Sequence, residues 1–401
     1  MQVPFDYGRT GRDVFEQSQG LRAAAVVETP GLHGTVLEDA VLGSLYAMHD
    51  TAQRDAAADD LRVYKAGVHE PRATEKFLSL DPGGSLAELE TVCRGAFGDT
   101  EYSVIVNKVE KWFPRVAPAV AQLTSEMQQR LPGSLLHAEL LYFIGDSRFT
   151  PFGVHIDDAA DALHFNFGSA PRQISLWEPE QFKELTGGTR SYYRSEDIAP
   201  HGQHHPVRQG DMFFLPATRY YHVAENHGFS VSMVLTLIQY APDRLVRRAM
   251  RSRAFELKVQ EWETGLAGEL LQRVDANETI KPSPAQGSTV DVADAVTDYV
   301  LRIRSNCGFR ATPRRIAIPA LDGRTVRRID PFPLILQESD AGAIKIFARG
   351  TVISCPDRAH IRELVQALSG GDTVDVEARI GTPEARRILT ELVGLSAVEV
   401  L

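Results

Sequence analysis

Hydrophobic and polar positions alternate in short runs between about residues 100 and 240, and glycine, proline or asparagine separates the runs. Runs rich in β-branched and aromatic residues predict strands over 61–67, 102–107, 138–145, 161–168, 172–178, 211–215 and 229–240. Many short antiparallel strands with a two-residue period are typical of a barrel or jelly roll. Helical spacing of apolar residues predicts helices over 84–96 and 115–131, the second ended by Pro132 and Gly133.

The pattern changes after Pro242. Residues 243–273 and 289–305 predict helices with a linker-like segment, 277–287, between them, and such helices could pair two subunits in a homodimer. The last segment predicts a small domain that resembles a winged helix, with a hairpin over 343–354, helices over 357–368 and 383–393, and strands over 375–379 and 398–401. We therefore expect an α+β protein with domains at 1–241, 242–306 and 307–401.

Composition narrows the class of protein. A chain of 401 residues can hold two or three domains, and 43% hydrophobic with 24% charged residues is typical of a globular protein. No apolar run reaches the length of about 18 residues that a membrane span needs, and the N-terminus shows no apolar signal region, so we expect a cytoplasmic protein. The three cysteines are far apart, which fits neither a disulfide framework nor a Cys-rich zinc site.

The net charge of −10 argues against nucleic-acid binding by the surface as a whole. Residues 301–330 differ, because they carry eight arginines and only two aspartates. This stretch fits a solvated face whose arginines pair within the molecule, and it also fits a docking surface for an acidic peptide or RNA.

His155 and Asp157 are the first candidates for chemistry. Side chains at i and i+2 of a strand share one face, so the imidazole and the carboxylate project together. A third candidate, His222, lies between two apolar runs, 212–216 and 229–238, that we expect to form neighbouring strands. Two histidines and one carboxylate with open coordination positions are the ligand set of non-haem Fe(II) oxygenases. The alternative is a hydrogen-bonded histidine beside a turn aspartate.

Arg172 opens the strand that follows Gly168. An arginine inside a barrel is costly unless it meets an anion, and its planar guanidinium suits a carboxylate; the alternative is a surface arginine. In 229–239 the polar residues Ser230, Ser232 and Thr236 share one parity, which fits a strand that lines a polar cavity and equally one that faces solvent. Tyr142 could hydrogen-bond a ligand or lie buried as an aromatic.

Other histidines and tyrosines are weaker candidates. His201, His204 and His205 fall in an expected loop, where solvated histidines are more common than a second metal site. Tyr220 and Tyr221 precede His222 and are expected to line the mouth of its site.

Together, His155-Ile-Asp157, Arg172 after a glycine turn, and Leu215-Pro-Ala-Thr-Arg-Tyr-Tyr-His222 resemble the JmjC/cupin-like 2-oxoglutarate oxygenases, most of all the bacterial branch related to the ribosomal oxygenases. The resemblance implies a double-stranded β-helix core in 1–241. It also implies Fe(II) held by His155, Asp157 and His222, with O2 as the oxidant. Arg172 would pair with the distal carboxylate of 2-oxoglutarate, and Tyr142 and Ser232 are candidates for its hydrogen-bond partners.

The function that this resemblance implies is a hydroxylase of a side chain in a protein or peptide, with release of succinate and CO2. The appended C-terminal domain and the basic stretch favour such a substrate. A hydroxylase of a free amino acid or small metabolite is the second hypothesis. The third is a metal-binding cupin without catalysis, or a DNA-binding regulator; helices 357–368 and 383–393 are mixed in charge, which disfavours DNA binding.

Overall fold

The computed structural model describes residues 5–29, 34–50, 54–131, 136–168, 170–239, 245–251, 292–339, 342–379 and 381–401. The chain forms two compact units: Met1–Arg130 with Ala138–Ile238, and Leu131–His137 with Gln239–Leu401. Both contain helices and antiparallel strands, which confirms the expected α+β class. Within the described ranges, no helix is both long and apolar enough to cross a membrane.

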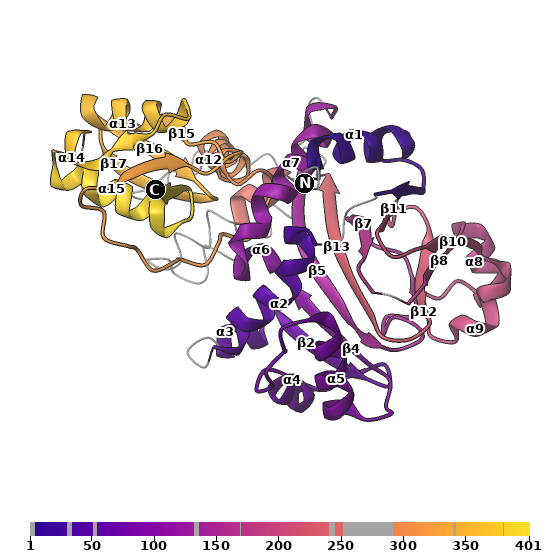
Figure 1. Cartoon of the computed structure of the whole chain (residues 1–401). Coiled ribbons are helices and arrows are strands. Elements are labelled where there is room, and N and C mark those ends of the chain that lie inside the picture. The colour runs from indigo at the N-terminus through magenta and orange to yellow at the C-terminus, as the bar shows by residue number, and fades with distance from the viewer. Residues whose placement is uncertain are drawn as a thin grey trace, which may run out of the picture. The chain divides into compact units, whose positions relative to one another are not determined.

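Two antiparallel sheets form the centre of the first unit (Figure 1). The first sheet contains, in spatial order, β11 (Asp211–Leu215), β7 (Asp161–Asn166), β13 (Ser230–Gln239) and β5 (Leu136–Asp146). It is extended beyond β11 by β1 (Ala25–Glu28), and beyond β5 by β4 (Tyr102–Asn107), β2 (Leu61–Lys65) and β3 (Val68–His69). The second contains, in order, β10 (Gln203–Val207), β8 (Arg172–Trp177), β12 (Tyr221–Asn226), β6 (Val154–His155) and β9 (Ser191–Tyr192).

Apolar side chains from both sheets fill the space between them. This core cluster comprises Ala162, Ile174, Leu176, Val207, Phe213, Leu215, Ala217, Ala224 and Val234. Because side chains alternate along a strand, each contributing strand sends every second residue inward. The outer face of the second sheet is covered separately, through Trp177 and Val223, by α8 (Pro179–Thr186) and α9 (Ser195–Ile198).

The remaining helices of this unit lie mostly before β5. They are α1 (Tyr7–Gln17), α2 (Val36–His49), α3 (Arg54–Ala58), α4 (Pro71–Phe77), α5 (Leu86–Phe97), α6 (Val109–Trp112) and α7 (Ala117–Gln129), with 3-10 turns η2 (Pro114–Val116) and η3 (Ala199–His201). Capping explains where α5 begins, since the Ser85 hydroxyl accepts a hydrogen bond from the Glu88 N–H at 3.2 Å.

The second unit holds a three-stranded meander of β15 (Ile335–Ser339), β16 (Ala343–Ala348) and β17 (Thr351–Pro356). A second small sheet has the order β18 (Val374–Asp375), β14 (Thr325–Arg328) and β19 (Val398–Val400). Its helices are α12 (Val292–Ser305), α13 (Ala359–Ser369), α14 (Val376–Arg379) and α15 (Pro383–Gly394). A separate apolar core joins α13 and α15 to these strands.

Several expected elements differ in the structure. The runs 212–216 and 229–238 are not neighbouring strands, because β7 pairs with both β11 and β13 and lies between them. The expected loop at 201–205 is largely strand β10, which pairs with β8. The expected strand at 375–379 is wrong: β18 pairs with only two residues of β14, and the helix-forming residues that follow become α14.

The structure describes part of the region predicted to be helices and linker. Residues 245–251 are helical, and α12 agrees with the expected helix at 289–305 from Val292 onward. The rest of the helix predicted at 243–273, and the linker after it, lie outside the described residues.

Three arginines of 301–330 form ion pairs within the molecule. Arg315 lies 2.7 Å from Glu391, Arg327 2.6 Å from Glu399, and Arg328 2.5 Å from Asp330. These pairs favour the intramolecular interpretation of the basic stretch for those three side chains.

Candidate metal centre

Strand pairing brings the two histidines together. β12 lies beside β6 in the second sheet, and His222 is the direct antiparallel partner of His155. Directly opposed side chains lie on the same face, so both imidazoles project to one side. Asp157 follows β6 by two residues, and its backbone N–H donates to the Ala217 carbonyl at 2.9 Å, which fixes the chain that carries the carboxylate.

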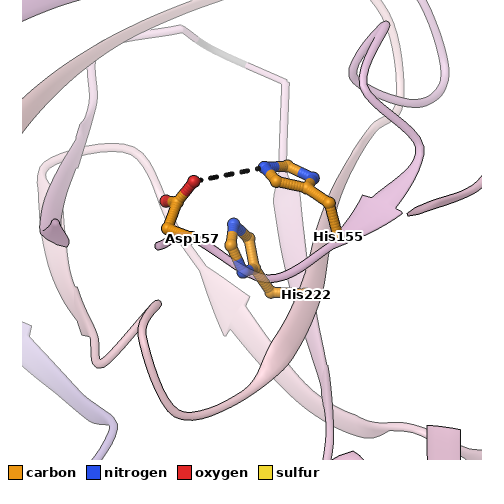
Figure 2. Close-up of side chains that lie close together, drawn as sticks. All are labelled: His155, Asp157 and His222. Carbon is orange, nitrogen blue, oxygen red and sulfur yellow. Dashed lines mark ion pairs between the residues drawn. The ribbon is translucent and has the colours of Figure 1, made fainter. Parts of the chain in front are cut away.

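Figure 2 shows the carboxylate of Asp157 and the two imidazoles directed toward one another. One candidate ligand atom from each of the three residues lies within 4.8 Å of the others. His155 Nε2 is 3.8 Å from Asp157 Oδ1, and the two imidazole centroids are 4.4 Å apart. Two atoms 3.8 Å apart can bind the same metal ion, because bonds of about 2.0–2.2 Å to nitrogen and oxygen let two ligands lie up to about 4.4 Å apart.

Backbone carbonyls orient both rings. His155 Nδ1 lies 2.9 Å from the Gly153 carbonyl, and His222 Nδ1 lies 3.3 Å from the Tyr220 carbonyl. A carbonyl can only accept, so these contacts require the proton on Nδ1 and leave the lone pair on Nε2. An imidazole held in this way presents Nε2 to a metal.

Gly153 has a geometric role in this support. Its φ is +64°, and a Cβ built there would lie 2.6 Å from the Tyr192 carbonyl oxygen of β9. Only glycine therefore fits the close approach that places its carbonyl beside His155.

Burial sets the protonation of the site. It lowers the pKa of His222 to about 3, with a further contribution from His155, and the Tyr220 carbonyl opposes the shift only partly. His222 is therefore a neutral imidazole, as a metal ligand must be. Burial also raises the pKa of Asp157; His155 lowers this pKa, whereas Asp158 and Asp161 raise it. A bound cation would counter this cost of holding the carboxylate charged.

Arg172 lies inside the two-sheet unit with only 3% of its surface exposed. Its Nη1 donates to the Ser232 hydroxyl of β13 in the opposite sheet, and its buried Nε has no hydrogen-bond partner within the described part of the chain. No carboxylate among the described residues pairs with it. Burial lowers its pKa to about 10, so it remains charged at neutral pH. A buried charge without a counter-ion is costly, which makes this guanidinium a candidate site for an anion.

A small pocket adjoins Arg172. Its lining is largely polar and consists of Ser103, Phe143, Ile144, Gly145, Ser147, Thr150, Arg172, Asn226 and Ser230. The buried Thr150 Oγ1 and Asn226 Oδ1 have no hydrogen-bond partner in the described structure, so this pocket offers polar atoms that a ligand or water could satisfy.

The structure decides between several alternatives from the sequence. Ser232 is fully buried and contacts Arg172, so the polar side of β13 lines the interior at this position and does not face solvent. Tyr142 is not brought to the site: its hydroxyl donates to the Leu37 carbonyl of α2. Tyr221 stacks on Phe182 of α8, with ring centroids 3.7 Å apart, and so packs outside the second sheet.

The three histidines near residue 200 do not form a metal cluster in the described structure. His204 Nδ1 bonds the Ser175 hydroxyl at 2.9 Å, and His205 packs against Phe213 with centroids 5.1 Å apart. The interior contains another histidine that the sequence did not single out, His164 of β7, whose two ring nitrogens are buried without partners. The signal that could have found it is a histidine within a strongly apolar strand.

No protein-family model and no curated protein matches the sequence. The fold is similar to solved structures of the Escherichia coli ribosomal oxygenase YcfD. One is 15% identical, and another, in complex with cobalt and 2-oxoglutarate, is 16% identical; each comparison covers 97% of this chain and 98% of that chain with a TM-score of 0.46. A third, in complex with cobalt and succinic acid, is 15% identical with a TM-score of 0.45. We therefore argue the function from this chain's own residues.

Proposed function

We propose that the protein is an Fe(II)- and 2-oxoglutarate-dependent oxygenase that hydroxylates a side chain of a protein or peptide. The observation that carries the proposal is the combination of three residues that could hold a metal ion with a buried guanidinium that meets no carboxylate among the described residues, both in the same two-sheet unit. A metal-binding protein without catalysis needs the cluster but has no use for Arg172. We also propose that the eight strands from β5 to β13, β9 excepted, form the double-stranded β-helix of such enzymes, since the chain distributes them over two facing sheets.

The residues fit the groups that this reaction needs. His155, Asp157 and His222 would hold Fe(II) and leave coordination positions open. Arg172 and Ser232 would hold the distal carboxylate of 2-oxoglutarate. When bound, these groups and O2 supply the oxidation, in which 2-oxoglutarate gives succinate and CO2 and one oxygen atom enters the substrate.

The protein's own residues would orient the metal ion and the cosubstrate. The Gly153 and Tyr220 carbonyls hold the two imidazoles by Nδ1, so both Nε2 atoms would be free to bind the ion, and Arg172 would hold the far end of the cosubstrate. The apolar residues between the sheets, among them Ile174, Leu176 and Phe213, lower the polarity of the interior and so strengthen the attraction of Arg172 for an anion.

The second unit supports a macromolecular substrate. Its order α13, β18, α14, α15, β19 resembles a winged helix, a fold often used to dock macromolecules. Three of its arginines, Arg315, Arg327 and Arg328, pair with carboxylates of the same unit. A small-metabolite hydroxylase is the alternative. Incubation with candidate proteins, followed by mass spectrometry for an added oxygen that depends on the enzyme, separates the two.

Three measurements test the core proposal. The wild-type protein should bind Co(II) or Mn(II), bind 2-oxoglutarate in the presence of the metal, and release succinate with Fe(II), 2-oxoglutarate and ascorbate. His155→Ala should lose metal binding. Arg172→Met should keep metal binding and lose 2-oxoglutarate binding, whereas the control Arg219→Met, at an exposed arginine, should behave as wild type. Metal binding without any affinity for 2-oxoglutarate would refute the oxygenase assignment.

A further inference from the structure

His164 projects into the space between the two sheets. On β7 it lies directly opposite Phe213 of β11 and Val234 of β13, both members of the core cluster between the sheets. Directly opposed residues share a face, and Ala162, two residues earlier on β7, belongs to the same core cluster. The imidazole therefore occupies the interior, where its surroundings are mainly apolar.

A buried polar group without a partner needs an explanation. His164 is 9% exposed, and neither of its ring nitrogens has a hydrogen-bond partner among the residues that the structure describes. Leaving such a group unsatisfied is unfavourable, so an interior that uses histidine at this position either tolerates the cost or meets a ligand there. An apolar residue of similar volume would fill the position without leaving a buried polar group unsatisfied.

Arg172 and His222 both affect the pKa of His164. Burial first, then the electrostatic effects of Arg172 and His222, hold the pKa of His164 well below its ordinary value. The imidazole is therefore neutral and offers one N–H donor. Arg172 and His222 both contribute to the lowering of this pKa.

The strand register shows where His164 lies relative to Arg172 and Ser232. Arg172 reaches across to Ser232, which is the partner of Asn166 on β7, and His164 lies two residues from Asn166 on the same face. Two residues of strand span roughly 7 Å. An anion bound to the guanidinium on the side that faces the candidate metal centre would thus lie between Ser232 and His164 along the strand direction.

We propose that His164 is a positioning residue for the cosubstrate: its N–H donates to the same carboxylate that Arg172 holds. A dicarboxylate 2-oxoacid would then be held from both sheets, by Arg172 of β8 and by His164 of β7. This inference rests on the proposed function, and it adds a residue that distinguishes a 2-oxoacid with a distal carboxylate from one without.

The test compares His164→Leu with wild type in two measurements on the Mn(II)-loaded full-length protein. Calorimetric titration should show that 2-oxoglutarate binds His164→Leu about 10- to 100-fold more weakly, the usual effect of removing one hydrogen bond to a charged group. Affinity for 2-oxobutyrate, which lacks the distal carboxylate, should stay the same. Without ligand, the melting temperature of the variant should equal or exceed that of wild type, because a partnerless imidazole is replaced by an apolar side chain.

Two further variants sharpen the result. His164→Asn keeps a donor and should recover part of the lost affinity for 2-oxoglutarate. His205→Leu makes the same chemical change at a histidine on β10 that packs on Phe213, and it should leave the affinity unchanged. In wild-type protein labelled with 15N at histidine, the imidazole N–H resonance of His164 should shift when 2-oxoglutarate binds.

The outcomes separate this inference from the proposed function. If wild type fails to bind 2-oxoglutarate, the proposed function fails. If wild type binds it with Arg172 dependence but His164→Leu binds equally well, only the role of His164 is refuted. Equal weakening for 2-oxoglutarate and 2-oxobutyrate, or a destabilised ligand-free variant, would also refute it, since either result indicates a structural role.

Discussion

Gly153→Ala tests whether the backbone beside His155 supports the metal centre. The new Cβ would lie 2.6 Å from the Tyr192 carbonyl oxygen, well inside van der Waals contact, in a backbone with φ of +64°. The left-handed conformation costs a non-glycine residue roughly 1 kcal/mol, and overpacking against a fixed backbone costs about 1–3 kcal/mol. The expected loss of unfolding free energy is therefore about 2–4 kcal/mol unless the chain moves away from β9.

Such a movement would displace the Gly153 carbonyl that orients His155. Loss of a supporting contact to a metal-ligating histidine typically lowers metal affinity 10- to 100-fold. Titration of the protein with Co(II), followed by its visible absorption, should therefore show weaker binding in Gly153→Ala. Urea unfolding measures the stability change in parallel.

Gly187→Ala is the matched control. Gly187 also has positive φ, +76°, at the end of α8, but nothing lies within 4 Å of the Cβ that alanine would add. It should lose about 1 kcal/mol of stability and keep the wild-type affinity for Co(II). If Gly153→Ala binds Co(II) as tightly as Gly187→Ala, the backbone does not hold His155 in the way we argue.

Three further predictions concern stability. Burial raises the pKa of Glu110 from 4.5 to about 8. The protonated carboxyl therefore stabilises the fold fully below pH 4.5, the pKa of the unfolded state, and this contribution is lost as the pH rises to about 8. Glu110→Gln should be more stable than wild type above pH 8, by about 2–5 kcal/mol in urea unfolding. Equal pH dependence in both proteins would contradict this. Asp60 is buried and accepts from Lys108 and Lys111 at 2.6 and 2.7 Å, so Asp60→Ala should lose about 3 kcal/mol at pH 7; a loss below 1 kcal/mol would show that solvent replaces these contacts. Leu392→Ala, in the core of the second unit, should lower that unit's stability by about 2–5 kcal/mol and leave Co(II) affinity unchanged; a change in affinity would contradict the assignment of the site to the first unit.

The sequence by itself determined the class of the fold and most of its local elements. The strand at 211–215 coincides with β11 and that at 102–107 with β4, since β-branched and aromatic residues with a two-residue period are a local signal. The start of α15 at Thr382 and Pro383 was also local: the Thr382 hydroxyl accepts from the Ala385 N–H at 3.2 Å. His155, Asp157, His222 and Arg172 stood out because their spacing relates each of them to a strand.

Only the tertiary structure decided how these elements meet. That β7 separates β11 from β13, and that β12 places His222 opposite His155, depends on pairing between distant segments, which no local pattern encodes. The same is true of Gly153, whose need for glycine comes from the approach of β9, and of Tyr142, whose hydroxyl contacts α2 and not the site. In the sequence, His164 is one residue of an apolar strand. It becomes a candidate for ligand binding only because the second sheet buries it, where Arg172 and His222 affect its pKa. Long-range pairing decides which face of a strand becomes the interior, and thereby which polar side chains lose water and need another partner.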